Sequence, residues 1–354
     1  MSEQSADGRL SAETPSSILS GWRLDAGVAA LSALMVAGVA LDFKAHASGI
    51  SFAEEGFLTP EHAFFYSMFL GVAGLIAAAT YRRRLDGATW VDAVPEGYGW
   101  GVVGVLVFGG AGAGDFLWHS AFGFEESFQA LVSPSHLALA TGATLFLASP
   151  LRAAWYRETD PRGGALVPAV VSATLVLAIL SLFGSFVNPA IRPYPAYESV
   201  GERMPVAFLV AYPLLLVGAA TALARRFRLP PGSFTVLFAV PVFVSTLLEG
   251  HPLLAVPALV AGVLADALAW RRPPTPTNRR WLRLFCTLLP AAFAAAYLAV
   301  VELGYPGGIA HVQVETYTTW SPHVLGGAVV LPAAAGLLLS YALAPGPGTG
   351  GDES

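Results

Sequence analysis

Six residues that can ligate a metal ion recur in a fixed order in the first half of the chain. In each of two units an Asp-x3-His pair is followed by a helix start of the form Ser/Thr-Pro-x-His, and the second unit begins 73 residues after the first. The candidate ligands are Asp42, His46 and His62 in the first unit and Asp115, His119 and His136 in the second. Carboxylate oxygen and imidazole nitrogen together bind zinc, copper or iron.

The spacing predicts how helices would bring these groups together. An aspartate and a histidine four residues apart project from one face of a helix. Thr59 and Ser133 are typical N-caps, and the prolines after them suit the first helical position. The last histidine of each unit then lies in the first turn of the next helix, beside the Asp-x3-His pair across a hairpin. A network of Asp–His pairs that joins helix ends without a metal is the alternative.

Composition predicts the elements that carry these hairpins. Hydrophobic residues make up 55% of the 354 residues and charged residues 12%, which is typical of an all-α, polytopic integral membrane protein. Stretches of about 20 apolar residues can each cross a bilayer. We expect about ten spans, near 24–46, 61–81, 98–119, 134–156, 165–187, 205–225, 233–249, 252–270, 281–303 and 322–344. The seventh and eighth are so close that a re-entrant pair is an alternative.

These spans predict a division of the chain into two membrane halves and two tails. Residues 1–22 are polar and form a cytoplasmic tail without the pattern of a cleaved signal peptide. Residues 23–157 form the half with the duplicated hairpin, residues 158–344 the second half, and the Gly- and Pro-rich residues 345–354 a flexible tail.

The arginines predict the orientation. With a cytoplasmic N-terminus, 16 of the 19 basic residues lie on the cytoplasmic side, as the positive-inside rule requires. We therefore expect a multi-pass protein of the plasma membrane with both termini in the cytoplasm. All seven histidines then lie at the outer face, which places the metal sites there.

Charge and cysteine content limit which partners the chain can bind and which atoms can ligate a metal. The formal net charge is −5, and the expected outer face has no basic patch, so nucleic acid is excluded as a partner. Cys286 is the single cysteine of the chain, so ligands are expected to be nitrogen and oxygen atoms rather than thiolates.

The second half has its own candidate groups at the expected outer face. They are candidates for further ligands or for groups that support the ligands of the first half: Glu249, His251, His311, Glu315 and His323. A capped helix start with a structural histidine is the alternative for each. In the first half, the small residues 109–114 precede Asp115, and we expect them to allow close helix packing or to open a narrow passage.

Residues 35–145 resemble the C subunit of the copper membrane monooxygenases, the family of particulate methane monooxygenase and ammonia monooxygenase. The resemblance lies in Asp42-x3-His46 with Thr59-Pro60-Glu61-His62 and the aromatic residues that follow, and in the second unit with its Glu125-Glu126 pair. It implies two neighbouring copper sites, one in each unit, and assembly with other membrane subunits. This chain has aspartate at 115 where the family has asparagine, and it continues through about six further spans.

Three functions follow from the ligand types. The first is a copper-dependent membrane monooxygenase, or a subunit of one, that oxidises a small apolar substrate with dioxygen; two histidines and one carboxylate also suit iron. The second is non-catalytic handling of copper or zinc at the outer face. The third is a zinc-dependent membrane hydrolase. Expected partners are the lipid bilayer and either other membrane subunits or further copies of the chain.

Overall fold

The computed structural model describes residues 19–47, 59–122, 132–185, 188–189, 203–249, 252–302 and 322–344. Within these ranges the chain forms helices and no strand, so the predicted all-α class is confirmed. The long helices are α1 (Gly21–Ala47), α3 (Pro60–Leu85), α5 (Gly99–Phe122), α7 (Pro134–Leu147), α9 (Val167–Phe183), α10 (Arg203–Arg226), α11 (Ser233–Glu249), α12 (Val256–Arg271), α13 (Arg279–Glu302) and α14 (Pro322–Leu343). Short helices are α4 (Trp90–Ala93) and α8 (Ser149–Tyr156), with 3-10 turns at Gly163–Leu166, Pro252–Ala255 and Pro276–Asn278.

Nine segments in the described part of the chain are long and apolar enough to cross a membrane, which makes this a multi-pass membrane protein. Each of the ten predicted stretches contains helix. The seventh stretch is the one not counted among the nine, because α11 has only 17 residues and extends roughly 26 Å at 1.5 Å per residue. Helices α9 and α12 are no longer than α11, but the 3-10 turn before each of them lengthens its apolar segment. The fourth span joins two helices, because α7 ends at Leu147 and α8 begins at Ser149 with a proline in its first turn.

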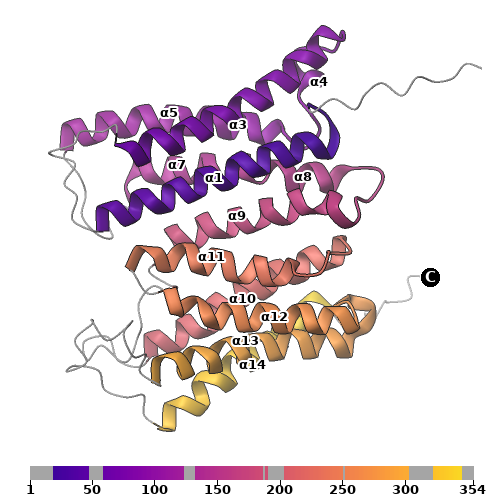
Figure 1. Ribbon diagram of the computed structural model, residues 1–354. Helices are drawn as coiled ribbons and strands as arrows, with labels where there is room; N and C mark the ends of the chain where they lie inside the picture. The colour runs from indigo at the N-terminus through magenta and orange to yellow at the C-terminus, as the bar shows by residue number, and fades with distance from the viewer. Residues whose placement is uncertain are drawn as a thin grey trace, which may run out of the picture.

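Helices α11 and α12 pack as an antiparallel pair, an arrangement that two complete spans and a re-entrant pair share, so the re-entrant alternative stays a prediction. Asp266, near the end of α12, accepts hydrogen bonds from the backbone amides of Gly232, Phe234 and Thr235 at the start of α11. The start of α11 and the end of α12 therefore lie at the same level, and the two helices run side by side from there (Figure 1).

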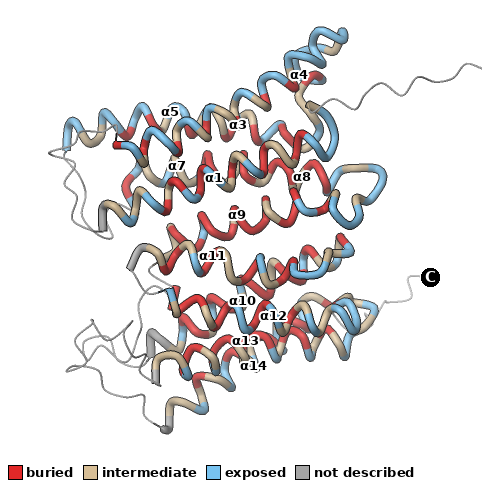
Figure 2. The backbone as a smooth tube through the Cα atoms, viewed as in Figure 1, coloured by how far each residue is buried: buried red, intermediate tan, exposed pale blue. Residues whose placement is uncertain are grey.

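The bundle has two hydrophobic clusters that meet on α9. One joins α1, α3, α5 and α7, and the other joins α10 to α14. Along α9, Ala173 and Leu177 belong to the second cluster, whereas Leu175 and Ile179 belong to the first. Figure 2 shows α9 as a mostly buried helix in the middle of the stack, between more exposed outer helices. Because α9 contributes to both clusters, the clusters do not mark a boundary at residue 157, and the two-half division stays a prediction.

Glycines set the close approach of α5 and α7. A Cβ atom on Gly104 would lie 2.6 Å from the carbonyl oxygen of Gly142, and one on Gly142 would lie 2.6 Å from the backbone nitrogen of Phe108. Small residues let helix backbones approach in membranes, where packing rather than the hydrophobic effect joins helices. This contact brings the first turn of α7 against the last turns of α5.

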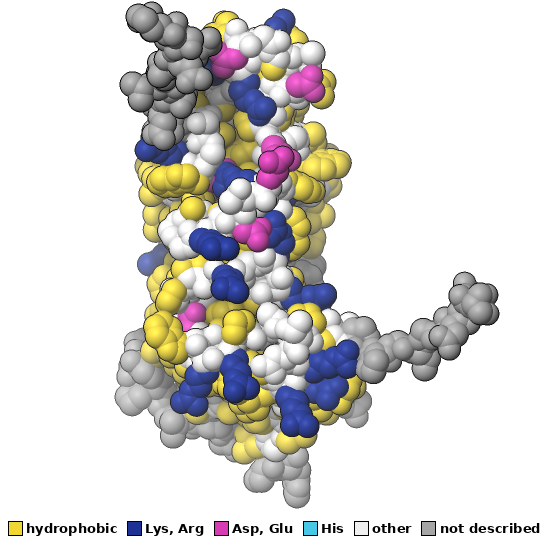
Figure 3. Space-filling view, turned by 90° about the vertical axis from the view of Figure 1, so that its right-hand side faces the viewer, with side chains coloured by type: hydrophobic (Ala, Val, Ile, Leu, Met, Phe, Trp, Pro, Cys, Tyr) yellow, Lys and Arg dark blue, Asp and Glu magenta, His cyan; other side chains and the backbone are white. Residues whose placement is uncertain are grey.

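The helix ends divide into two groups at opposite ends of the bundle (Figure 1). The ends of α1 and α5 and the starts of α3 and α7 meet at one end, which carries the candidate ligands. Figure 3 faces the opposite end and shows Arg side chains spread across it, with no described histidine in view. The predicted separation of arginines from histidines therefore appears in the packed structure.

A buried carboxylate joins three segments at the arginine-rich end. Asp25 of α1 is 2% exposed, forms an ion pair with Arg157 after α8, and accepts a hydrogen bond of 2.8 Å from the hydroxyl of Tyr98 before α5. Burial, followed by the nearby Asp25 carboxylate, raises the pKa of the Tyr98 hydroxyl, so it stays a hydrogen-bond donor. The sequence analysis did not identify this network.

Candidate metal centre

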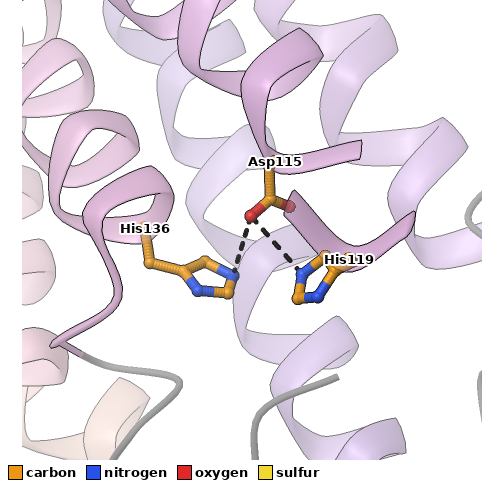
Figure 4. A group of neighbouring side chains, drawn as sticks. All are labelled: Asp115, His119 and His136. Carbon is orange, nitrogen blue, oxygen red and sulfur yellow. Dashed lines mark ion pairs between the residues drawn. The ribbon is translucent and has the colours of Figure 1, made fainter. Parts of the chain in front are cut away.

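The second unit provides a carboxylate and an imidazole from adjacent turns of α5. Asp115 is 2% exposed and His119 lies four residues later, so both project from the same face of the helix. The distance from Nε2 of His119 to Oδ1 of Asp115 is 3.4 Å. Figure 4 shows both side chains pointing toward a common position beside α7.

The third group, His136, comes from the first turn of α7. Ser133 is the N-cap of this helix, and its hydroxyl accepts a hydrogen bond from the backbone amide of His136 at 3.4 Å. The same hydroxyl lies 2.8 Å from Nδ1 of the His136 ring. With Nδ1 held there, Nε2 faces Asp115 and lies 3.8 Å from its Oδ1 atom (Figure 4).

These three groups have the spacing of a metal-ligand set. One ligand atom from each of Asp115, His119 and His136 can be chosen so that all lie within 4.8 Å of one another, in the part of the chain that the structure describes. Ligand bonds of about 2.1 Å put neighbouring ligand atoms roughly 3.4 Å apart in a tetrahedral site. The observed separations therefore fit one ion after small side-chain shifts.

The environment of the Asp115 carboxylate favours a cation. Its Oδ1 atom is buried and has no hydrogen-bond partner among the described residues. Its contacts with the imidazoles of His119 and His136, at 3.4 and 3.8 Å, are long, so burial of this charge is costly and a bound cation offsets that cost. The side chains of His119 and His136 remain 10% and 22% exposed, so neither imidazole is fully enclosed.

The first unit has a different geometry. Nδ1 of His62 lies 2.7 Å from Oδ1 of Asp42 and 3.2 Å from the hydroxyl of Thr59, the N-cap of α3. His46 belongs to α1, but its side chain lies outside the described residues. The described geometry thus brings Asp42 and His62 together as predicted and leaves the three-ligand set of this unit a prediction.

Tyr66 connects the two units, and no role was assigned to it from the sequence. It lies one turn after His62 in α3, with ring centroids 6.1 Å apart. Its hydroxyl interacts electrostatically with both Asp115 and Asp42, and a Cβ atom on Gly112 would lie 2.8 Å from it. The sequence signal that could have identified Tyr66 is its place among the aromatic residues in the first turns after the Thr-Pro-x-His helix start.

The glycine-rich segment before Asp115 makes one close contact rather than a continuous close helix interface. Gly112 packs against Tyr66, whereas a Cβ atom on Gly110 or Gly114 would meet nothing within 4 Å. The expected close packing therefore occurs at Gly112 within this segment, and the closest approach of α5 and α7 is instead at Gly104. Gly112 lacks the side chain that would displace the Tyr66 hydroxyl from beside Asp115.

The candidate groups of the second half are not placed at this centre. Glu249 ends α11 and His323 begins α14, but their side chains lie outside the described residues, as do the whole of His251, His311 and Glu315. Their participation stays a prediction. Cys286 is buried in α13, in the other cluster from the centre.

Comparison of the chain with protein-family models, with curated proteins and with solved structures yields no match.

Proposed function

We propose that Asp115, His119 and His136 bind one copper ion at the outer face of the membrane, and that the protein acts with dioxygen on a small apolar substrate. The observation that supports metal binding is the buried Oδ1 atom of Asp115, which faces two imidazole nitrogens and has no hydrogen-bond partner among the described residues. Copper is proposed from the resemblance of residues 35–145 to the C subunit of the copper membrane monooxygenases.

The ligand chemistry is compatible with copper, iron and zinc. Two imidazoles and one carboxylate suit each of these ions, and such a set leaves coordination positions open. Bound copper would supply the redox chemistry that activates dioxygen. The protein's own residues would hold the ion, orient His136 through Ser133, and keep the Asp115 carboxylate away from bulk water.

Two exposed apolar side chains follow Asp115 on the same helix. Phe116 and Leu117 follow Asp115 in α5 and are 50% and 66% exposed, so they face lipid once the span is in a membrane. A small apolar substrate is proposed from the family resemblance, and these exposed apolar side chains are compatible with its arrival from the bilayer. The outer location of the centre and the cytoplasmic termini rest on the arginines at the opposite end of the bundle.

Metal handling without turnover is the second candidate. The 22% exposure of the His136 side chain favours it, because an exposed ligand permits exchange of the ion with a partner. The monooxygenase and the metal-handling function use the same three ligands. They differ in whether the bound ion is retained and reacts with dioxygen or is passed on. Other membrane subunits or further copies of the chain are proposed as partners from the family resemblance.

Metal analysis of the purified membrane protein, combined with electron paramagnetic resonance, tests the proposal. We expect about one copper per chain at the second unit, lost in the variant H119A/H136A and kept in the matched variant H62A. Copper together with oxygen consumption supports the monooxygenase; exchangeable copper without it supports metal handling. Zinc would redirect the chemistry to hydrolysis or transport. Unchanged metal content in H119A/H136A and in D115N would overturn the site.

A further inference from the structure

A basic cavity lies at the end of the bundle opposite the candidate metal centre. It has a volume of about 710 Å³ and lies between the loop after α8, the end of α10, the start of α11 and the segment between α12 and α13. Four arginines line it, namely Arg162, Arg225, Arg226 and Arg228, together with a single carboxylate, Asp160. The lining therefore has a strong excess of positive charge.

Three of the four arginines keep their charge available. Arg226 pairs with Asp160, donates a hydrogen bond of 3.0 Å to the carbonyl oxygen of Trp155, and lies over the ring of Phe227. By contrast, Arg162, Arg225 and Arg228 are exposed, and within the described ranges none of them forms an ion pair or a side-chain hydrogen bond. The single acid of the cavity neutralises the one arginine that is already fixed in place.

The start of α11 adds no further anion site. Its amides at Phe234 and Thr235 already donate to Asp266, so the positive charge of the cavity comes from the arginine side chains. Guanidinium groups bind phosphate oxygens through paired, charge-assisted hydrogen bonds. Thr275 and Thr277 also line the cavity, and because their hydroxyls are hydrogen-bonded to each other at 2.8 Å, one hydroxyl proton of the pair can be donated to the same ligand.

The cavity lies at the level where a membrane meets water. Trp155, Tyr156 and Trp270 are 41%, 59% and 79% exposed next to it in sequence, and exposed aromatic side chains of this kind mark the headgroup region. Leu229, Phe234 and Ala269 give the cavity an apolar part beside its arginines. Basic pockets between membrane helices at this depth bind lipid headgroups.

We propose that this cavity binds a phosphate group through Arg162, Arg225 and Arg228, carried either by an anionic phospholipid or by a soluble phosphate ester. The proposal is independent of the metal centre, since it uses different residues at the other end of the bundle. Its interfacial depth and apolar part favour the phospholipid.

Binding of phosphatidylglycerol, phosphatidylcholine and glycerol 3-phosphate to the delipidated full-length protein tests the proposal, by native mass spectrometry and by thermal stabilisation. The pocket variant is R162Q/R225Q/R228Q. The matched control is R82Q/R83Q/R84Q, which removes the same charge from the end of α3 at the same end of the bundle. Because the pocket variant loses its charge-assisted guanidinium–phosphate hydrogen bonds, it should bind phosphatidylglycerol about 100-fold more weakly than the control variant does.

The outcomes distinguish a phospholipid from a soluble phosphate ester as the source of the bound phosphate group. Saturable binding of phosphatidylglycerol that is lost in the pocket variant and kept in the control supports the phospholipid. The same pattern with glycerol 3-phosphate supports a soluble phosphate ester. Equal losses in the two triple variants, or no loss in either, would show general attraction to a basic surface and would overturn the cavity as a site.

Discussion

Replacement of Asp115 by asparagine should leave the metal-free protein at least as stable as the wild type and reduce the stabilisation that bound metal provides. Asparagine keeps the shape of the side chain and removes its charge. The carboxylate is 2% exposed and its Oδ1 atom lacks a hydrogen-bond partner within the described residues, and an unsatisfied buried polar group costs about 1–3 kcal/mol. Asparagine removes the larger cost of a buried charge and gives up only the long contacts with His119 and His136, at 3.4 and 3.8 Å. The metal-free D115N protein should therefore be as stable as the wild type or more stable, by up to about that amount.

Copper should stabilise D115N less than it stabilises the wild type. A ligand at 1,000 times its Kd stabilises the folded state by about 4 kcal/mol. Loss even of groups that only orient metal ligands weakens binding by about 10- to 100-fold, and loss of the Asp115 charge should do at least as much. Each tenfold loss lowers the stabilisation by about 1.4 kcal/mol, so D115N should forfeit about 1.4–2.7 kcal/mol of it.

Thermal unfolding in lipid nanodiscs, with a chelator and then with copper, measures both effects. The matched control is D25N, the same change at a carboxylate that is also 2% exposed but is satisfied by Arg157 and Tyr98. D25N should lower stability by about 1–3 kcal/mol in both conditions and keep the full stabilisation by metal. If D115N instead lowered metal-free stability and left the metal-induced shift intact, Asp115 would be a structural partner of the histidines.

Three further substitutions test local parts of the structure. S133A removes the N-cap of α7 and the group that holds Nδ1 of His136, so it should cost about 1 kcal/mol in a thermal melt and weaken metal binding about tenfold in a titration. G142A places a Cβ atom 2.6 Å from the backbone nitrogen of Phe108, and overpacking of this kind should cost about 1–3 kcal/mol in the melt; no change would argue against the close approach of α5 and α7. D266N weakens four hydrogen bonds at the start of α11 and should cost about 1–3 kcal/mol with unchanged metal content.

Most of the fold follows from local signals in the sequence. Apolar stretches predicted helix at every expected span, and the Thr-Pro and Ser-Pro pairs marked the starts of α3 and α7 at the correct residues. Two features were harder to predict from the sequence. The length of α11 depends on packing, and the break between α7 and α8 at Ala148 occurs at a proline inside an otherwise continuous apolar stretch. The Asp25 network joins residues from three separate segments, and no local pattern predicts such a contact.

The candidate centre was predictable to the level of which residues meet. Helical periodicity alone puts Asp115 beside His119, and the short hairpin brings His136 to the same end. The position of Tyr66 was not predictable, since it depends on the absence of a side chain at Gly112 on another helix. The proposed identity of the metal comes from the family resemblance and has no counterpart in the described geometry.

The two units share a sequence pattern and yet differ in which ring nitrogen faces the carboxylate. In the second unit the Ser133 hydroxyl lies beside Nδ1 of His136, and Nε2 is the atom that faces Asp115. One nitrogen held by a supporting group and the other directed at the ion is the usual arrangement of a metal-binding histidine. In the first unit Nδ1 of His62 faces both its capping hydroxyl and Asp42. An ion shared between Asp42 and His62 through Nδ1 would have to displace that contact, and one bound through Nε2 would require the ring to turn. The second unit needs neither change, and for this physical reason it is the stronger candidate for the first metal ion to bind.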